Sequence, residues 1–139
     1  MKRNRRWWPH ALIALVWTTT IALSGDRSVT AAEATGTYRD GKSEIKILSV
    51  SSGKLKVEMN IVAPLDEGSV SGEASIEDDV AIFVPTVTEG CKITMTFLED
   101  GSLQVESEGR PVDCGLGRKA PPDGTYKKAS NAKPKFSSE

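Results

Sequence analysis

Alternating apolar and polar residues constrain the fold of this chain more than any other feature. The alternation runs through residues 44–50 and 54–62, and again through 91–98 and 102–109, with a glycine-containing turn inside each pair. Successive side chains of a β-strand point to opposite faces, so this period indicates strands and not helices. Three-residue turns with glycine in the left-handed position join such strands. The pattern therefore predicts two antiparallel hairpins.

A three-residue turn also fixes which residues lie opposite each other in the two hairpins. It places apolar residues together on one face and opposite charges together on the other, which stabilises a sheet. A turn one residue shorter would move every apolar side chain to the other face. The predicted partners are Ile45 with Met59, Ile47 with Val57, Lys46 with Glu58, Ile93 with Ser107, Met95 with Val105, Phe97 with Leu103, Lys92 with Glu108 and Thr96 with Gln104.

Residues 69–76 and 80–85 predict a third hairpin, joined by the turn Glu77-Asp78-Asp79. This turn has no glycine, and residues 64–68 form the preceding loop in this interpretation. Pro85 ends the second strand, because proline cannot donate a ladder hydrogen bond. The predicted inward set is Val70, Ala74, Ile76, Val80, Ile82 and Val84.

The chain nearly repeats one tetrapeptide at its two ends. Gly36-Thr37-Tyr38-Arg39 stands early, and Gly124-Thr125-Tyr126-Lys127 stands late. Either the first and last strands lie side by side and close a barrel, or common strand residues coincide by chance. Counting both gives eight short strands, the number at which side chains just fill a barrel. The sequence thus predicts an all-β fold, a small antiparallel barrel with a packed core.

The first 31 residues differ in composition from the rest. They hold five of the basic residues, all three tryptophans and the only histidine, His10. A basic start, an apolar stretch at 11–23 and small residues after it are typical of a secretory signal peptide. The stretch is shorter than a membrane span requires.

Two overlapping small-residue patterns, at residues 29–31 and 30–32, place the predicted cleavage between Ala31 and Ala34. The predicted organisation is a signal peptide at 1–32, a barrel domain at 33–128 and a flexible tail at 129–139. We expect a periplasmic or secreted protein.

Without the leader, the protein has eighteen acidic and thirteen basic residues, and it has no histidine. This composition excludes a histidine general base and a Cys–His nucleophile, and it argues against nucleic acid as a partner. We expect no enzyme activity, no cofactor and no metal. Cys91 and Cys114 are an even pair in an exported chain, which predicts a disulfide between them.

Residues 114–123 form the most unusual segment, glycine-rich, then basic, then stiffened by two prolines. Short constrained loops often carry recognition, and glycine amides can also hold an anion. The alternative is a connector that needs glycine for a tight bend. The candidate binding loop is Gly115, Leu116, Gly117, Arg118 and Lys119, with Phe83 and Leu98 as possible outward neighbours.

Acidic residues offer two weaker candidates. Glu77-Asp78-Asp79 has oxygen ligands that suit calcium, although acidic turns are usually only solvated. Glu106 and Glu108 share an outer face as paired carboxylates do, but their predicted partners Thr94 and Lys92 explain them without catalysis.

The segments Cys91-Lys92-Ile93-Thr94-Met95-Thr96-Phe97, Cys114-Gly115-Leu116-Gly117 and Asp123-Gly124-Thr125-Tyr126 resemble those of a group of small exported bacterial β proteins. The resemblance implies export, a disulfide and a β fold, and it implies no activity. More distantly, the chain is similar to periplasmic lysozyme inhibitors, and an acidic surface would suit a basic lysozyme. We therefore expect a protein that binds an envelope partner, with a lipocalin-like carrier of small molecules as the alternative.

Overall fold

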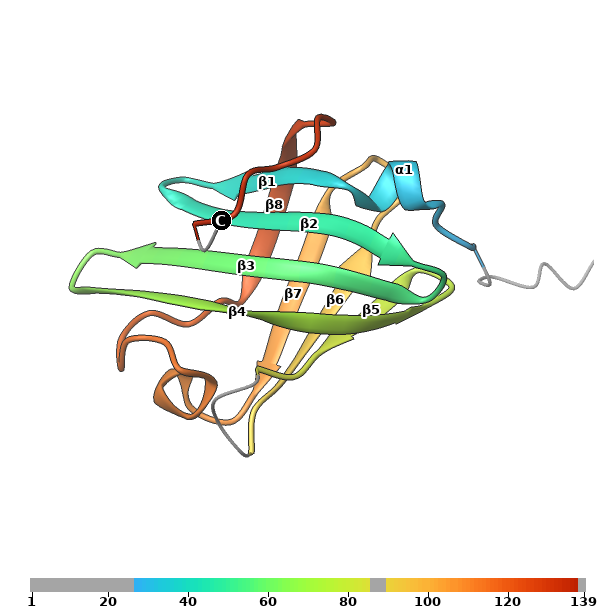
Figure 1. Cartoon of the computed structure of the whole chain (residues 1–139). Helices are drawn as coiled ribbons and strands as arrows, with labels where there is room; N and C mark the ends of the chain where they lie inside the picture. Colours follow the sequence, from blue (N-terminus) through green and yellow to red (C-terminus); the bar gives the residue numbers. More distant parts are fainter. Residues whose placement is uncertain (1–26, 86–89, 138–139) are drawn as a thin grey trace, which may run out of the picture.

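The computed structural model describes residues 27–85 and 90–137, which form a closed barrel of eight antiparallel strands (Figure 1). Each strand pairs with the next one along the chain, and the last pairs with the first. The predicted all-β barrel is confirmed. Its elements are α1 (Ala31–Ala34), β1 (Gly36–Asp40), β2 (Ser43–Ser51), β3 (Lys54–Ala63), β4 (Asp66–Glu77), β5 (Val80–Phe83), β6 (Lys92–Phe97), β7 (Leu103–Glu108), the short 3-10 helix η1 (Pro111–Cys114) and β8 (Gly124–Ser130).

Both glycine-turn hairpins have the predicted registers. All the partners predicted for β2 with β3 and for β6 with β7 are observed. Gly53 and Gly101 have φ of 75° and 87°, a conformation that side chains other than glycine rarely adopt. Glycine at these two positions therefore sets which face of each strand is buried.

The third hairpin differs from its prediction in the length of its turn. Glu77 pairs with Val80, so only Asp78 and Asp79 form the turn, and Asp78 takes φ of 56°. The predicted turn includes Glu77 and is therefore one residue longer than the observed turn. Shortening a turn by one residue exchanges the inward and outward side chains of the strand that follows, here β5. Ala81 and Phe83 therefore point inward, and the predicted inward positions of Val80, Ile82 and Val84 are wrong. Every residue from 80 to 84 is apolar, so alternation could not distinguish the two faces.

The predicted loop at residues 64–68 is also shorter than expected. β3 ends at Ala63 and β4 begins at Asp66, so Pro64 and Leu65 alone connect them. Asp66, Glu67 and Gly68 pair with the end of β3 despite their loop-like composition. Ladder bonds join backbone atoms, so polar side chains at an exposed strand end do not prevent pairing.

The near-repeat at the two ends reflects barrel closure, because β1 pairs with β8. Its two tyrosines are both buried and are held alike. The Tyr38 hydroxyl donates to the Ala34 carbonyl at 2.9 Å, and the Tyr126 hydroxyl donates to the Pro122 carbonyl at 2.7 Å. In each case the acceptor lies four residues upstream of the tyrosine. The two strands are therefore preceded by the same tyrosine-to-carbonyl hydrogen bond.

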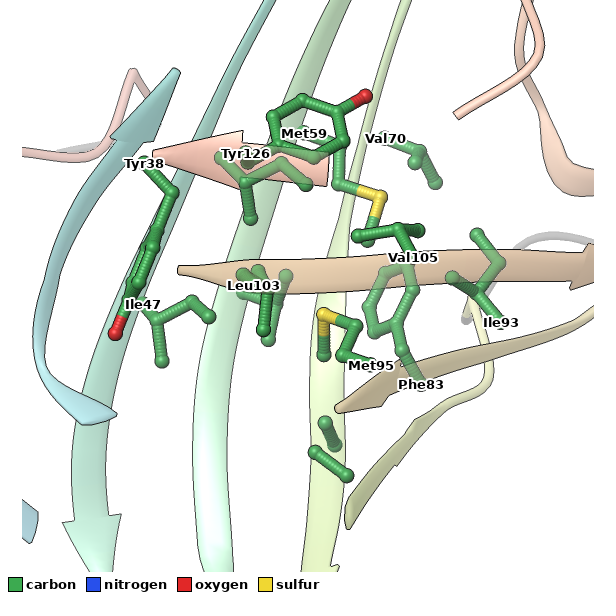
Figure 2. Close-up of a cluster of buried hydrophobic side chains, with 14 of the residues drawn as sticks. Tyr38, Ile47, Met59, Val70, Phe83, Ile93, Met95, Leu103, Val105 and Tyr126 are labelled. Atoms are coloured by element: carbon green, nitrogen blue, oxygen red, sulfur yellow. The ribbon is translucent and has the colours of Figure 1, made fainter. Parts of the chain in front are cut away.

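Side chains from all eight strands fill the barrel interior as one cluster (Figure 2). Small residues lie opposite large ones, as where Ala74 faces Phe83. The sequence analysis favours a packed interior over an open ligand-binding cup, and the buried cluster agrees with a packed interior. The largest side chains with less than 2 % exposure are Tyr38, Phe83, Ile45, Ile47, Leu55, Met59, Ile93, Met95, Leu103, Val57 and Val105, with Tyr126 at 2 %.

Both ends of the barrel are covered (Figure 1). At one end lie α1 and the residues before it, with Ala34 buried in the core and Val29 packed against it. At the other end the loop that contains η1 inserts Leu116 and Ala120 into the same core. None of the helices among the described residues is long and apolar enough to span a membrane.

The segment after β8 lies along the outside of the barrel, over β2 and β3. Phe136 is buried there, with the Lys56 ammonium 4.3 Å from the centre of its ring. Ser137 donates its backbone N–H and its hydroxyl to Glu58, at 3.0 and 2.9 Å. The predicted flexible tail began at residue 129, whereas residues 129 and 130 complete β8 and 135–137 make these specific contacts.

Candidate functional site

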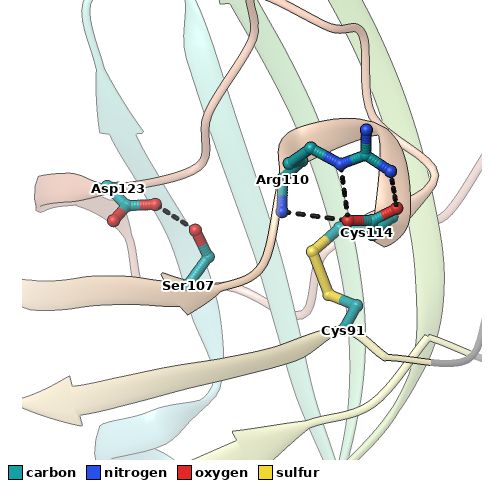
Figure 3. Close-up of a disulfide and its surroundings, with 6 residues drawn as sticks. Cys91, Ser107, Arg110, Cys114 and Asp123 are labelled. Atoms are coloured by element: carbon teal, nitrogen blue, oxygen red, sulfur yellow. Dashed lines mark hydrogen bonds and ion pairs between the residues drawn. A yellow bond between two sulfur atoms is a disulfide. The ribbon is translucent and has the colours of Figure 1, made fainter.

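The Cys91–Cys114 disulfide is present and joins the start of β6 to the end of η1 (Figure 3). The two Cα atoms are 5.0 Å apart, and both cysteines are buried. Beside the disulfide, Arg110 pairs with Asp113 at 3.1 Å across the single turn of η1. The bridge therefore fixes the beginning of the candidate loop to the barrel wall.

The loop from Gly115 to Lys119 closes the barrel end. Gly115 ends η1 with φ of 79°, and its N–H donates to the Val112 carbonyl, which is a common role for glycine after a helical turn. Leu116 is only 4 % exposed. The alternative interpretation, a connector that needs glycine to bend past the disulfide, thus accounts for Gly115 and Leu116.

The loop amides already have an anionic partner within the chain. Asp66, at the start of β4, accepts the backbone N–H of Lys119 at 3.2 Å. Backbone hydrogen bonds from Lys119, Glu67 and Arg118 hold the pKa of Asp66 below its ordinary value. A Cβ on Gly117 would lie 2.5 Å from the Asp66 carboxylate. Gly117 therefore serves this internal contact, and only the side chains of Arg118 and Lys119 are exposed.

The paired carboxylates Glu106 and Glu108 lie on the outer face, as predicted, opposite Thr94 and Lys92. Both are exposed. In residues 27–85 and 90–137, no three His, Cys, Asp or Glu side chains gather closely enough to hold a metal ion.

Charge is divided between the two halves of the barrel. Residues 66–108, which contain β4 to β7, carry eleven acidic residues and one basic residue, Lys92. Residues 33–65 and 109–139 together carry seven acidic and twelve basic residues. Because β4 to β7 are neighbours in the closed sheet (Figure 1), they form an acidic half. Its exposed acids are Glu67, Glu73, Glu77, Asp78, Glu99, Asp100, Glu106 and Glu108.

An apolar stripe runs along the outer face of this acidic half. We call Val80, Ile82 and Val84 the β5 stripe; Val80 and Ile82 are half-buried, and Val84 is 54 % exposed. The stripe exists because of the two-residue turn before β5. The same turn makes Phe83 fully buried, so its predicted outward position is wrong, and Leu98 is half-buried.

One acidic residue lies directly beside the β5 stripe, and another lies one strand further away on the other side. On one side Glu77 lies directly opposite Val80. On the other, Ile82 faces Thr94, whose next partner is Glu106. A surface hollow of about 430 Å³ adjoins the stripe. Its lining residues are Ser75, Ile76, Glu77, Asp78, Asp79, Val80 and Ile82.

Neighbouring segments hold the turn that borders the hollow. The backbone N–H of Val29 donates to the Asp78 carbonyl at 3.1 Å, and that of Phe97 donates to the Asp79 carbonyl at 2.8 Å. These bonds come from the segment just before α1 and from the end of β6. The rim of the hollow is therefore anchored to two other parts of the barrel.

Sequence reasoning missed this surface for two reasons. The acidic residues are visible in the sequence at 66–108, but the sequence does not show which of them lie near exposed apolar side chains. The alternation predicts Val80, Ile82 and Val84 in the core, because the predicted turn is one residue longer than the observed one. Comparison of the chain with family models, curated proteins and solved structures found no match.

Proposed function

We propose that this protein is an exported, non-enzymatic binding protein whose acidic half binds a cationic partner protein of the cell envelope. The observation that carries the proposal is the β5 stripe, a partly exposed apolar surface within the acidic half of the barrel. Inhibition of a basic lysozyme is the specific form that we propose to test first.

The shape of the barrel favours binding on its outside. One cluster of side chains fills the interior, and segments of the chain cover both ends. A lipocalin-like carrier needs a cavity within the barrel, and the hollow beside β5 lies on the surface instead. We therefore place the contact on the sheet.

The chemistry of the stripe fits a protein partner. Protein interfaces have a desolvated apolar centre and a polar rim, and the β5 stripe with Glu77 and Glu106 has this arrangement. Opposite charge at the rim steers association and selects the partner. A partner with lysines and arginines around a small apolar patch would complement this face.

The chain offers little for catalysis. Its only histidine, His10, belongs to the predicted leader, and both cysteines are joined in the disulfide. Glu106 and Glu108 have the cross-strand partners Thr94 and Lys92. These observations support a binding role.

A lysozyme activity assay with the purified exported protein tests the specific form. Saturable inhibition is expected, and no inhibition at micromolar excess would reject lysozyme as the partner. A pull-down of envelope proteins tests the general form; if it retains no cationic protein, the proposal is wrong.

Paired charge-reversal variants test which surface makes the contact. Glu77→Lys with Glu106→Lys is expected to weaken binding on the order of tenfold or more, because Glu77 lies beside the stripe and Glu106 lies two strands from it. Lys42→Glu with Lys127→Glu is the matched control at exposed positions of the other half and is expected to leave binding intact. Arg118→Ala with Lys119→Ala tests the loop separately, and loss of binding in this variant alone would move the contact to the loop.

A further inference from the structure

The chain from Arg27 to Ala34 is built into the barrel. Thr30 and Glu33 form a reciprocal cap on α1, in which each side chain accepts the backbone N–H of the other residue, at 2.8 and 3.2 Å. Ala34 is 1 % exposed. The Tyr38 hydroxyl donates to the Ala34 and Glu33 carbonyls. The segment therefore covers one end of the core with satisfied polar groups.

Residues ahead of α1 make further contacts with other elements. Val29 packs against the core and donates its N–H to the Asp78 carbonyl. Arg27 donates to the Phe97 carbonyl at 3.3 Å. The first of these bonds reaches the β4–β5 turn, which borders the hollow beside the β5 stripe, and the second reaches the end of β6.

Cleavage between Ala31 and Ala34, as the small-residue pattern predicts, would remove this support. The cap residue Thr30 would be lost together with both hydrogen bonds of the reciprocal cap, so the single turn of α1 would lose the stabilisation of its N-terminus. The Asp78 carbonyl would lose the bond from Val29. Cleavage there would therefore remove contacts that residues 27–31 make with the barrel.

We propose that the leader is removed ahead of Arg27, so that residues 27–34 remain in the exported protein and support the rim of the β5 hollow. A suitable triplet lies just after the apolar stretch. Ala22-Leu23-Ser24 has small residues at the two positions that signal peptidases read. Cleavage after Ser24 leaves Gly25 as the first residue. This inference rests on the export part of the proposed function.

The intact mass and the N-terminal sequence of the protein exported from a bacterial host test the cleavage site. Gly25, or any start between it and Arg27, is the expected result. A start at Ala32 or later would overturn the proposal, and so would a chain exported without cleavage. The readout does not depend on partner binding, so a failed lysozyme assay leaves it unaffected.

Two matched variants sharpen the test. Ser24→Phe is expected to accumulate the uncleaved precursor, because a large residue blocks the site. Ala31→Phe, at an exposed position of α1, is expected to be processed like the wild type. The reverse pattern would place the site at Ala31 and overturn the proposal.

Thermal melting tests whether residues 27–31 stabilise the barrel. A chain that starts at Gly25 is expected to melt about 5 °C higher than one that starts at Ala32, because the latter lacks the Thr30 cap. Thr30→Ala in the longer chain is expected to lower the melting temperature in the same direction. Equal melting temperatures of the two chains would contradict the proposed contribution of residues 27–31.

Discussion

Two buried tyrosines show how single atoms secure this barrel. Tyr38 on β1 and Tyr126 on β8 each donate a hydroxyl hydrogen bond to a carbonyl four residues upstream. Burial raises the pKa of both hydroxyls, so both act as neutral donors over the ordinary pH range. Each bond fixes the chain just before the strand to the strand itself.

Tyr126→Phe is expected to lower the free energy of unfolding by about 1–2 kcal/mol, because the buried Pro122 carbonyl loses its donor. Tyr38→Phe should cost a similar amount, since its hydroxyl has the same role. Chemical denaturation measures both. Thr125→Ala, at the exposed neighbour, is the control and should cost less; an unchanged stability of Tyr126→Phe would contradict the role of the hydroxyl.

At the scale of elements, the two-residue turn at Asp78 and Asp79 decides what β5 buries. The turn pairs Ala74 with Phe83, so a small residue lies opposite a large one in the core. It leaves Val80 and Ile82 on the outer face. The proposed interaction surface thus depends on the length of one turn.

The faces of β5 can be tested by removing side chains. Phe83→Ala is expected to cost about 3–5 kcal/mol, as for a fully buried aromatic ring. Ile82→Ala should cost about 1 kcal/mol, because this side chain is already half outside the barrel. Urea unfolding of both variants gives the comparison. A larger loss from Ile82→Ala would restore the predicted register.

The docking of residues 135–137 over β2 and β3 depends on the charge of one carboxylate, that of Glu58. Glu58 is 5 % exposed. Its burial raises its pKa, but hydrogen bonds from Ser137 and Asn60 and the charge of Lys46 outweigh burial, so its pKa is lowered from 4.5. The ionised form is thus favoured in the folded state. Its stabilising contribution is complete above the ordinary pKa and is lost as the pH falls through the lowered one.

We therefore expect acid to release residues 135–137 from the barrel. The amide chemical shift of Ser137 in an acid titration measures this release. Glu58→Gln keeps an acceptor for Ser137 but has no charge to lose, so its tail is expected to stay docked across the titration. The same acid transition in this variant would show that another group controls the tail.

At the scale of the whole molecule, the disulfide joins the barrel wall to the loop that closes one end. Replacing Cys91 and Cys114 together by alanine is expected to lower the free energy of unfolding by about 3 kcal/mol, because the unfolded chain gains freedom. Chemical reduction of the wild type should give a similar loss. A difference below about 0.5 kcal/mol in chemical denaturation would contradict a stabilising role.

The division of charge is also a property of the whole molecule. Acidic residues concentrated between positions 66 and 108 lie together because β4 to β7 pair in chain order. The pairing of β1 with β8 brings together the two ranges that are richer in basic residues, 33–65 and 109–139. Closure therefore gives the barrel one acidic half and one more basic half.

The sequence by itself determined the hairpins of the all-β fold, the two glycine-turn registers and the disulfide. These features follow from local rules, because alternation and glycine turns such as Gly53 and Gly101 act over a few residues, and two cysteines allow one pairing. The tertiary structure alone decided the faces of β5, the close approach of Asp66 to the loop at Gly117, and the docking of residues 27–34. Those contacts join positions far apart in the chain, and in the uniformly apolar run at 80–84 only packing against Ala74 and Ile93 selects the buried face.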